Sequence, residues 1–296
     1  MINDFKLQLY VPSLDIKEYF GELRNKHLLS ILKYITNKDY KGLAEYFNYL
    51  IYELINNKTL YHNLDSFDKL IILLQLKAIN INSELKFKIN SNNENKLISY
   101  NIFNEIKKLI EIKFAKTKEL KLDDNFLILL SIPSTLYIEN FDDVFNNCIK
   151  LVKINDQTFS FDALSNDIKD KIFESISGNY MQEIFKFFEE IDKSCAGIKF
   201  LSENSYINEL NALNLNFFNN SIINFIELIY SEDLKNIFEL MYILTSKVKI
   251  SLSEFYELIP SESMLMYSLY AKDIKHQNEE LEKSTKTPGI PLKNAN

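Results

Sequence analysis

The spacing of apolar residues changes along the chain, and each spacing predicts a different kind of element. Residues 5–11 and 16–23 alternate weakly between apolar and polar side chains on either side of Pro12, which predicts an N-terminal β-hairpin. From residue 26 the apolar positions recur at helical spacing. Two helices are therefore expected, over residues 26–35 and 39–55.

A third helix is expected to begin at Asp65 or Ser66, since either side chain can cap the first turn. Residues 70–76 are almost continuously apolar, which is typical of a helix buried on more than one side. The face expected to be buried comprises Leu70, Leu73, Leu74 and the aliphatic stem of Lys77.

The middle of the chain mixes strand and helix patterns. Alternating residues predict strands at 82–89 and 97–102 around an Asn-rich turn, and a further pair at 111–114 and 119–122. Residues 123–133 are very apolar and fit a strand or a short helix. Helices are expected over 142–152, 165–175 and 179–191, with a short hairpin-like link at 156–161.

The last third begins with an expected strand pair at 197–214, followed by an apolar helical run at 221–244. Ser251 and Ser253 precede Glu254 in a capping pattern that predicts a short helix. Pro260 is suited to the first turn of the next helix, which is expected to run to residue 283.

Taken together, these elements predict an α+β chain in which helix dominates. The expected order is an N-terminal β-hairpin with helices, a small central antiparallel sheet, and a C-terminal hairpin with helices. We expect two domains, at residues 1–115 and 116–284. The tail at 285–296 is expected to be flexible, because it is rich in Pro and Gly and poor in large apolar residues.

Composition excludes several classes of protein. The net charge of −7 and a single arginine, Arg24, make duplex nucleic acid an unexpected partner. Lysines between residues 107 and 121 alternate with glutamates, which is typical of a solvated face. No apolar stretch reaches the roughly 18 to 20 residues of a membrane span. The two cysteines, Cys148 and Cys195, and a first segment without signal-peptide character indicate a reducing cytoplasm.

Candidate catalytic residues are few. His27 at a helix start, His62 in a loop and His276 in a charged helix all fit surface positions better than catalytic ones. Adjacent carboxylates at 123–124 and 142–143 would point to opposite faces of a strand, and they fit turns or helix caps. No phosphate-binding, nucleophile or zinc-protease motif occurs. We therefore expect no enzyme and no cofactor.

Aromatic and methionine side chains gather near the C-terminus. Tyr and Met are adaptable residues that are common at interfaces. Packing in the core and a partner-binding face of a projecting helix both explain this cluster. The residues that we expect to bind a partner are Phe255, Tyr256, Met264, Met266, Tyr267 and Tyr270.

Several short segments, in this order and spacing, resemble the baseplate hub subunit and hub assembly proteins of T-even-like contractile-tailed phages. The resemblance extends over residues 5–283. It is carried by Arg24-Asn25-Lys26 at a helix start, the helix at 67–78, the strand at 85–89, the segments 120–125 and 132–134, Asn147-Cys148-Ile149, Phe187-Phe188, and the C-terminal stretch 251–283.

The resemblance implies a tail baseplate hub component or hub assembly factor that binds other tail and hub proteins. It also implies a location in the host bacterial cytoplasm during assembly, or in the baseplate of the virion, and self-association stays open. The alternatives are a tail assembly chaperone absent from the mature virion, an enzyme with a cryptic site, and a helical bacterial regulatory protein.

One departure from the family bears on metal binding. The resemblance implies a Cys-x-x-Cys pair after the Phe-Phe helix, as in many members of that family, whereas Cys195 stands alone here. One cysteine cannot supply the four ligands of structural zinc, so no metal is expected, and Cys195 fits a small buried apolar residue.

Overall fold

A computed structural model describes residues 6–91, 94–111, 115–123, 125–139, 141–155, 157–176, 178–195, 221–231 and 234–285. The first half contains β1 (Leu7–Val11), β2 (Ile16–Phe20), α1 (Asn25–Asn37), α2 (Tyr40–Leu54), α3 (Lys58–Tyr61), α4 (Ser66–Asn80), β3 (Glu84–Ser91), β4 (Glu94–Asn101) and α5 (Ile102–Glu111). A second group follows: β5 (Thr117–Asp123), β6 (Phe126–Ser131), α6 (Phe141–Cys148), β7 (Ile149–Ile154), β8 (Gln157–Ser160), the 3-10 turn η1 (Phe161–Ala163), α7 (Asn166–Ser175) and α8 (Gly178–Cys195). The last elements are α9 (Ser221–Tyr230), α10 (Leu234–Ile243), the π-helical turn η3 (Leu244–Val248), α11 (Leu252–Glu257) and α12 (Pro260–Thr285).

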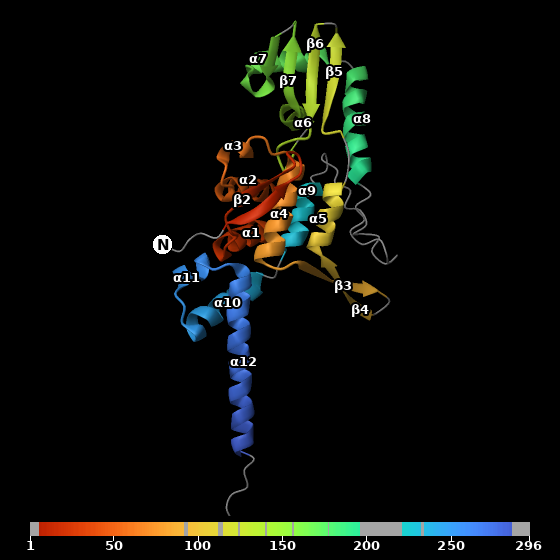
Figure 1. The fold of residues 1–296 in the computed structure, drawn as a ribbon. Helices are drawn as coiled ribbons and strands as arrows, with labels where there is room; N and C mark the ends of the chain where they lie inside the picture. Colours follow the sequence, from red (N-terminus) through yellow and green to blue (C-terminus); the bar gives the residue numbers. More distant parts are fainter. Residues whose placement is uncertain are drawn as a thin grey trace, which may run out of the picture.

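The core of the molecule is built around α4. Asp65 caps this helix, and its carboxylate accepts a hydrogen bond from the backbone N–H of Asp68. In return, the Asp68 carboxylate accepts a hydrogen bond from the backbone N–H of Asp65. Leu70, Leu73, Leu74 and Lys77 are all buried, as their pattern predicted. Helices α2, α5 and α9 and strand β1 pack around α4 (Figure 1). A helix surrounded in this way needs apolar residues on every side, which explains the unbroken run at 70–76.

The sheet β5–β8 forms a separate lobe at one end of the helical body (Figure 1). Its strands are antiparallel in the order β5-β6-β7-β8, and α8 packs beside β5. Backbone and side-chain bonds from α4 hold this lobe in place. The Ser66 N–H donates to the Pro133 carbonyl at 2.8 Å, and Lys69 Nζ donates to the Ser134 carbonyl at 2.6 Å. Lys116 Nζ lies 3.5 Å from a carboxylate oxygen of Asp65.

A third group, α10 to α12, lies at the opposite end of the body (Figure 1). It has a small apolar cluster of its own, formed by Leu240, Leu244 and Phe255. Pro260 opens α12, as predicted, and this helix then extends away from the body (Figure 1).

The predicted α+β class with dominant helix is confirmed, as are the N-terminal hairpin and the central antiparallel sheet. The division into domains at residues 115 and 116 stays a prediction. Contacts cross that boundary, because α9 packs on α4, α2 and α1, and Tyr230 Oη donates a 2.6 Å hydrogen bond to the Leu73 carbonyl. The expected strand pair at 197–214 and the tail beyond residue 285 lie outside the described residues.

Three sequence interpretations differ from the structure. Residues 102 and 111 were expected to end one strand and begin another, but they are the first and last residues of α5. Ile102, Ile106 and Leu109 are spaced for one buried helix face. The helix expected over 142–152 ends at Cys148, where β7 begins and pairs with both β6 and β8. The strand partner of β5 is β6, one of the two possibilities open for residues 123–133, and not the strand expected at 111–114.

Candidate functional site

The N-terminal end of α1 and the helix α11 meet through a set of polar contacts. The Asn25 backbone N–H donates to the Leu258 carbonyl at 2.9 Å. The Asn25 side chain donates to the Phe255 carbonyl at 2.8 Å and to Ser263 Oγ at 2.6 Å. Asn25 and Ser263 are both buried. These bonds attach α11 and the first turn of α12 to the body.

Charged residues surround this contact at the surface. Glu257 accepts hydrogen bonds from Arg24 at 2.6 Å and from Lys26 at 2.9 Å. These hydrogen bonds lower the pKa of the Glu257 carboxyl, the one from Lys26 having the larger effect. The charge of Glu257 is therefore retained at neutral pH.

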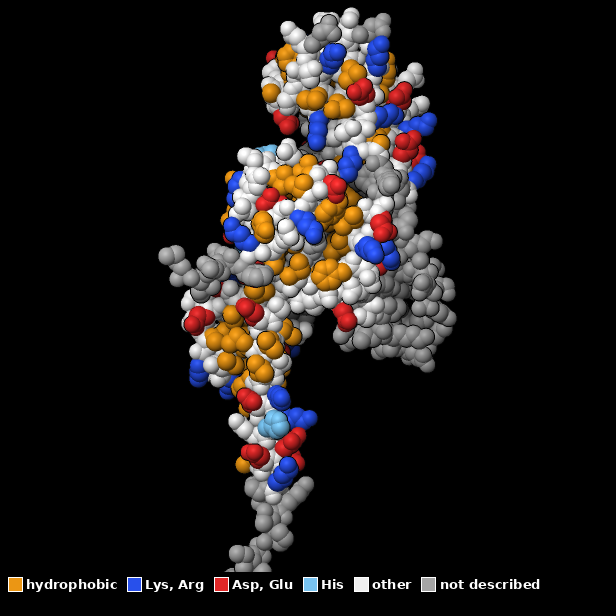
Figure 2. Space-filling view, viewed as in Figure 1, with side chains coloured by type: hydrophobic (Ala, Val, Ile, Leu, Met, Phe, Trp, Pro, Cys, Tyr) orange, Lys and Arg blue, Asp and Glu red, His pale blue; other side chains and the backbone are white. Residues whose placement is uncertain are grey.

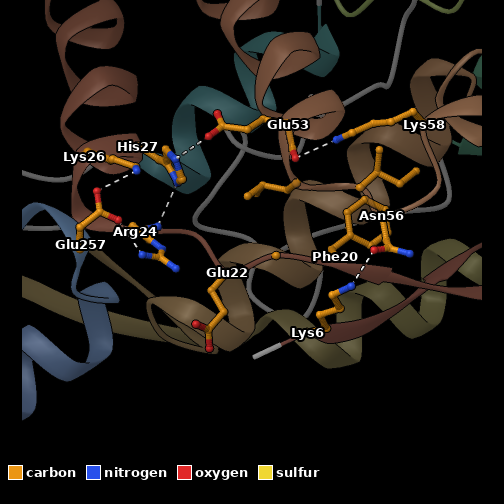
Figure 3. Close-up of a pocket in the computed structure, with 13 residues that line it drawn as sticks. Lys6, Phe20, Glu22, Arg24, Lys26, His27, Glu53, Asn56, Lys58 and Glu257 are labelled. Atoms are coloured by element: carbon orange, nitrogen blue, oxygen red, sulfur yellow. Dashed lines mark hydrogen bonds and ion pairs between the residues drawn. The ribbon is translucent and has the colours of Figure 1, made fainter. Parts of the chain in front are cut away.

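A cleft of about 510 Å³ opens beside these residues (Figure 3). Its walls include the basic residues Lys6, Arg24, Lys26 and Lys58 and the acidic residues Glu22, Glu53 and Glu257. Figure 3 shows His27 between Arg24 and Glu53. Both signs of charge occur along the cleft, and Glu257 pairs with Arg24 and Lys26, so the lining has no single sign of charge to select one ion.

His27 was expected to be a partly exposed surface residue, and this is wrong: it is buried. Its Nδ1 accepts a hydrogen bond from the Arg24 N–H at 3.0 Å, where it helps to cap α1. The proton of the neutral ring therefore lies on Nε2, which is 3.7 Å from Glu53 Oε1. Burial lowers the pKa of His27. Nδ1 already accepts a hydrogen bond and Nε2 carries the proton, so neither nitrogen is positioned to take a proton from a substrate. The ring has a structural role, as part of the cap of α1.

The residues expected to bind a partner do not share one environment. Phe255 is completely buried beside Leu240 and Leu244, so it packs inside the chain and has no surface to offer in this conformation. Tyr256 and Met266 are half-buried against the same cluster. The remaining residues lie on α12, with Met264 and Tyr267 exposed and Tyr270 half-buried. The role of these residues in binding stays a prediction.

The exposed apolar surface near the C-terminus is larger than the sequence interpretation expected. Every side chain from residue 271 to 283 is exposed. Figure 2 shows apolar side chains gathered on the lobe of α10 to α12, with charged side chains further along α12. The exposed apolar residues of α12 that were not singled out are Leu265, Leu269, Ile274 and Leu281. For Ile274 and Leu281 the signal was present in the sequence, as a spacing of seven residues from Tyr267 to Ile274 and from Ile274 to Leu281.

Within the described ranges, no group of three or more His, Cys, Asp or Glu residues is placed to hold a metal ion. The side chain of Cys195 lies outside the described residues, whereas Cys148 is buried. Among the described helices, none combines the length and the apolar character that crossing a membrane requires.

Comparison with known proteins identifies the family. A family model described as T4 bacteriophage base plate protein matches residues 23–217, which include α1 to α8. Comparisons with curated proteins and with solved structures gave no match. The matched range ends before α9, so α12 lies outside it. Since the match covers most of the chain, the protein belongs to the T4 bacteriophage base plate protein family, and its role is structural or lies in baseplate assembly.

Proposed function

We propose that this protein is a component or assembly factor of the phage baseplate hub that acts by binding other tail proteins, without catalysis. The observation that carries the proposal is α12, a helix of 26 residues that leaves the body and exposes apolar side chains (Figure 1). At 1.5 Å per residue such a helix is about 39 Å long.

The first turns of α12 are held rigidly. Ser263 is buried and bonded to Asn25, and Met266 packs against the cluster of Leu240, Leu244 and Phe255. The direction in which α12 leaves the body is therefore fixed by packed side chains. A helix fixed in this way presents its outer turns at a defined angle, as a docking element requires.

The outer turns gain little stability from their own chain. In proteins most of the stability of a helix comes from tertiary packing of its apolar face. Every side chain in residues 271–283 is exposed, so packing on the body contributes little to them. A partner that covers their apolar side chains would supply the missing stabilisation. The amphipathic-helix-in-groove mode of recognition fits this situation.

A specific experiment tests the proposal. A chain ending after Tyr270 removes the exposed turns but keeps Ser263 and Met266, and its control ends after Thr285. Both chains should keep the far-UV circular dichroism of a folded body. The shorter chain should lose co-purification with the co-expressed tail proteins of the same phage and reduce the yield of infectious particles. If it supports assembly at the normal level, the interface lies elsewhere, and the N-terminal hairpin becomes the next candidate.

The location of the protein after assembly distinguishes a hub subunit from an assembly chaperone. A hub subunit functions in the virion, whereas a chaperone acts in the host bacterial cytoplasm and is left behind. Mass spectrometry of purified particles should detect this protein if it is a subunit. Its absence from infectious particles, combined with the assembly defect of the truncated chain, would favour the chaperone.

A further inference from the structure

We propose that the outer half of α12 docks through one uncharged stripe into an apolar groove of another baseplate protein, and that one rim of this groove is basic. The inference rests on the proposed function, which it extends by defining the docking face and the chemistry of the partner. The stripe consists of Tyr267, Tyr270, Ala271, Ile274, Gln277, Asn278 and Leu281.

The stripe follows from the position of each residue around the helix. Successive residues of an α-helix are rotated by about 100°, so these seven residues fall within an arc of about 120°. No charged residue lies in this arc. The Lys, His, Asp and Glu side chains of residues 267–285 all lie on the remaining surface: Lys272, Asp273, Lys275, His276, Glu279, Glu280, Glu282 and Lys283. Tyr267, Ile274 and Leu281 repeat every seven residues, the spacing that keeps apolar residues in line along a packed helix.

The stripe continues a face that is already packed. Ser263 and Met266 lie on the same side of α12, where they contact the body. The stripe therefore emerges from beneath α10 and η3, which contact the first turns of α12. A partner seated on the stripe would prolong this apolar contact along the helix.

The charges at one border of the stripe indicate the chemistry of the partner. Asp273 and Glu280 both lie along this border, seven residues apart, and both are exposed. Their separation along the axis is about 10 Å at 1.5 Å per residue. The opposite border carries Lys275 and Glu282, whose charges offset each other. A groove with lysine or arginine along one rim would match the acidic border and fix the orientation of the helix.

A second copy of this chain fits the stripe poorly. In a parallel pair each body would occupy the space beside α12 that the other helix needs, since the stripe begins under the body. In an antiparallel pair with aligned stripes, Asp273 of one copy would face Glu280 of the other at both ends. Like charges placed opposite each other weaken such a pair. The geometry therefore favours a different protein as the occupant.

The test compares matched pairs of substitutions in the full-length chain. The first variant, Ile274→Ala with Leu281→Ala, removes apolar area from the stripe. Its control, Leu265→Ala with Leu269→Ala, removes exposed apolar area from the other side of α12. The probes are the baseplate proteins of the same phage, purified one by one, with binding measured by calorimetric titration. For a protein bound by the wild-type chain, the stripe variant should weaken binding by about tenfold or more, and the control by less than about threefold.

A second pair of variants tests the basic rim. Glu280→Lys reverses one charge of the acidic border, and Glu279→Lys makes the same change in net charge away from both borders of the stripe. The border variant should weaken binding more, and the difference should shrink as salt is raised. Equal effects of the two variants would overturn the basic rim.

Two results would overturn the docking stripe while leaving the proposed function intact. The first is a pair of outcomes: truncation after Tyr270 abolishes binding, but the full-length variant with Ile274→Ala and Leu281→Ala binds normally. The second is a dimer of the wild-type chain in sedimentation equilibrium that this variant dissociates, since the occupant would then be a second copy. A truncation without any effect on binding would instead overturn the site of the proposed function itself.

Discussion

Asn25 Nδ2 donates a 2.6 Å hydrogen bond to Ser263 Oγ, although the two residues are 238 positions apart in the sequence. Both side chains are buried, and the same nitrogen also donates to the Phe255 carbonyl. The start of α1 thereby holds α11 and the first turn of α12 in one arrangement. This contact fixes how the projecting helix leaves the body.

Replacing Asn25 by Ala should lower the free energy of unfolding by about 1 to 3 kcal/mol, because a buried carbonyl and a buried hydroxyl lose their donor. Urea denaturation followed by circular dichroism measures the loss. The exposed Asn37, at the other end of α1, gives the control Asn37→Ala, which should change stability by less than about 0.5 kcal/mol. Equal losses in both variants would mean that the Asn25 contact is not responsible.

The ion pairs of Glu257 should contribute much less than Asn25. Glu257 is 50% exposed, and its partners Arg24 and Lys26 are 27% and 42% exposed. Solvent screens such pairs, so Glu257→Ala should cost less than about 1 kcal/mol. The same denaturation experiment at low and high salt checks this. A loss above about 2 kcal/mol would show that these charges, rather than the buried amide, hold α11.

Leu73 is completely buried in the middle of α4, and its carbonyl accepts the hydrogen bond from Tyr230. Leu73→Ala should reduce the free energy of unfolding by about 2 to 5 kcal/mol, because it removes buried methyl groups and leaves a cavity. Ile79→Ala, at a position 41% exposed near the end of the same helix, is the matched control. A loss under about 0.5 kcal/mol at Leu73 would contradict the assignment of this face to the core.

Asp65 should make stability depend on pH. Burial, and then the charge of Asp68, raise the pKa of Asp65 from 3.8 to about 6, and Lys116 opposes this shift. Between these pH values the folded state holds a proton that the unfolded state has released, so the contribution of Asp65 to stability falls as pH rises. Asp65→Asn can still cap α4 but cannot ionise, and the fall should disappear in this variant.

Urea denaturation at intervals between about pH 4 and pH 7 measures this effect. Asp39→Asn is the control, because Asp39 caps α2 in the same way but is exposed. An Asp65→Asn variant whose stability keeps the wild-type slope over this range would show that the carboxyl is not responsible.

The purified protein is expected to hold no stoichiometric zinc, because Cys195 stands alone in its part of the sequence. Elemental analysis of protein purified without a metal-affinity step provides the measurement. One zinc per chain would contradict this expectation. Cys148→Ala and Cys195→Ala would then identify which thiol contributes to the site.

Elements whose signals are local could be predicted from the amino-acid sequence. Asp65 and the apolar run after it predicted α4, and Ser251 with Glu254 predicted the capped helix α11, because a cap and a buried face are formed by residues close together in the chain. Which surfaces those elements bury depends instead on how they pack against one another in the folded chain. His27 is buried because α2 and α11 lie beside it, and α9 joins the N-terminal helices through Tyr230 and Leu73. The same limit applies to the candidate site, where Phe255 and Met264 have similar sequence signals, yet one lies in a core cluster and the other in solvent. Burial depends on contacts between residues far apart in the chain, and a local pattern of apolar side chains does not contain them.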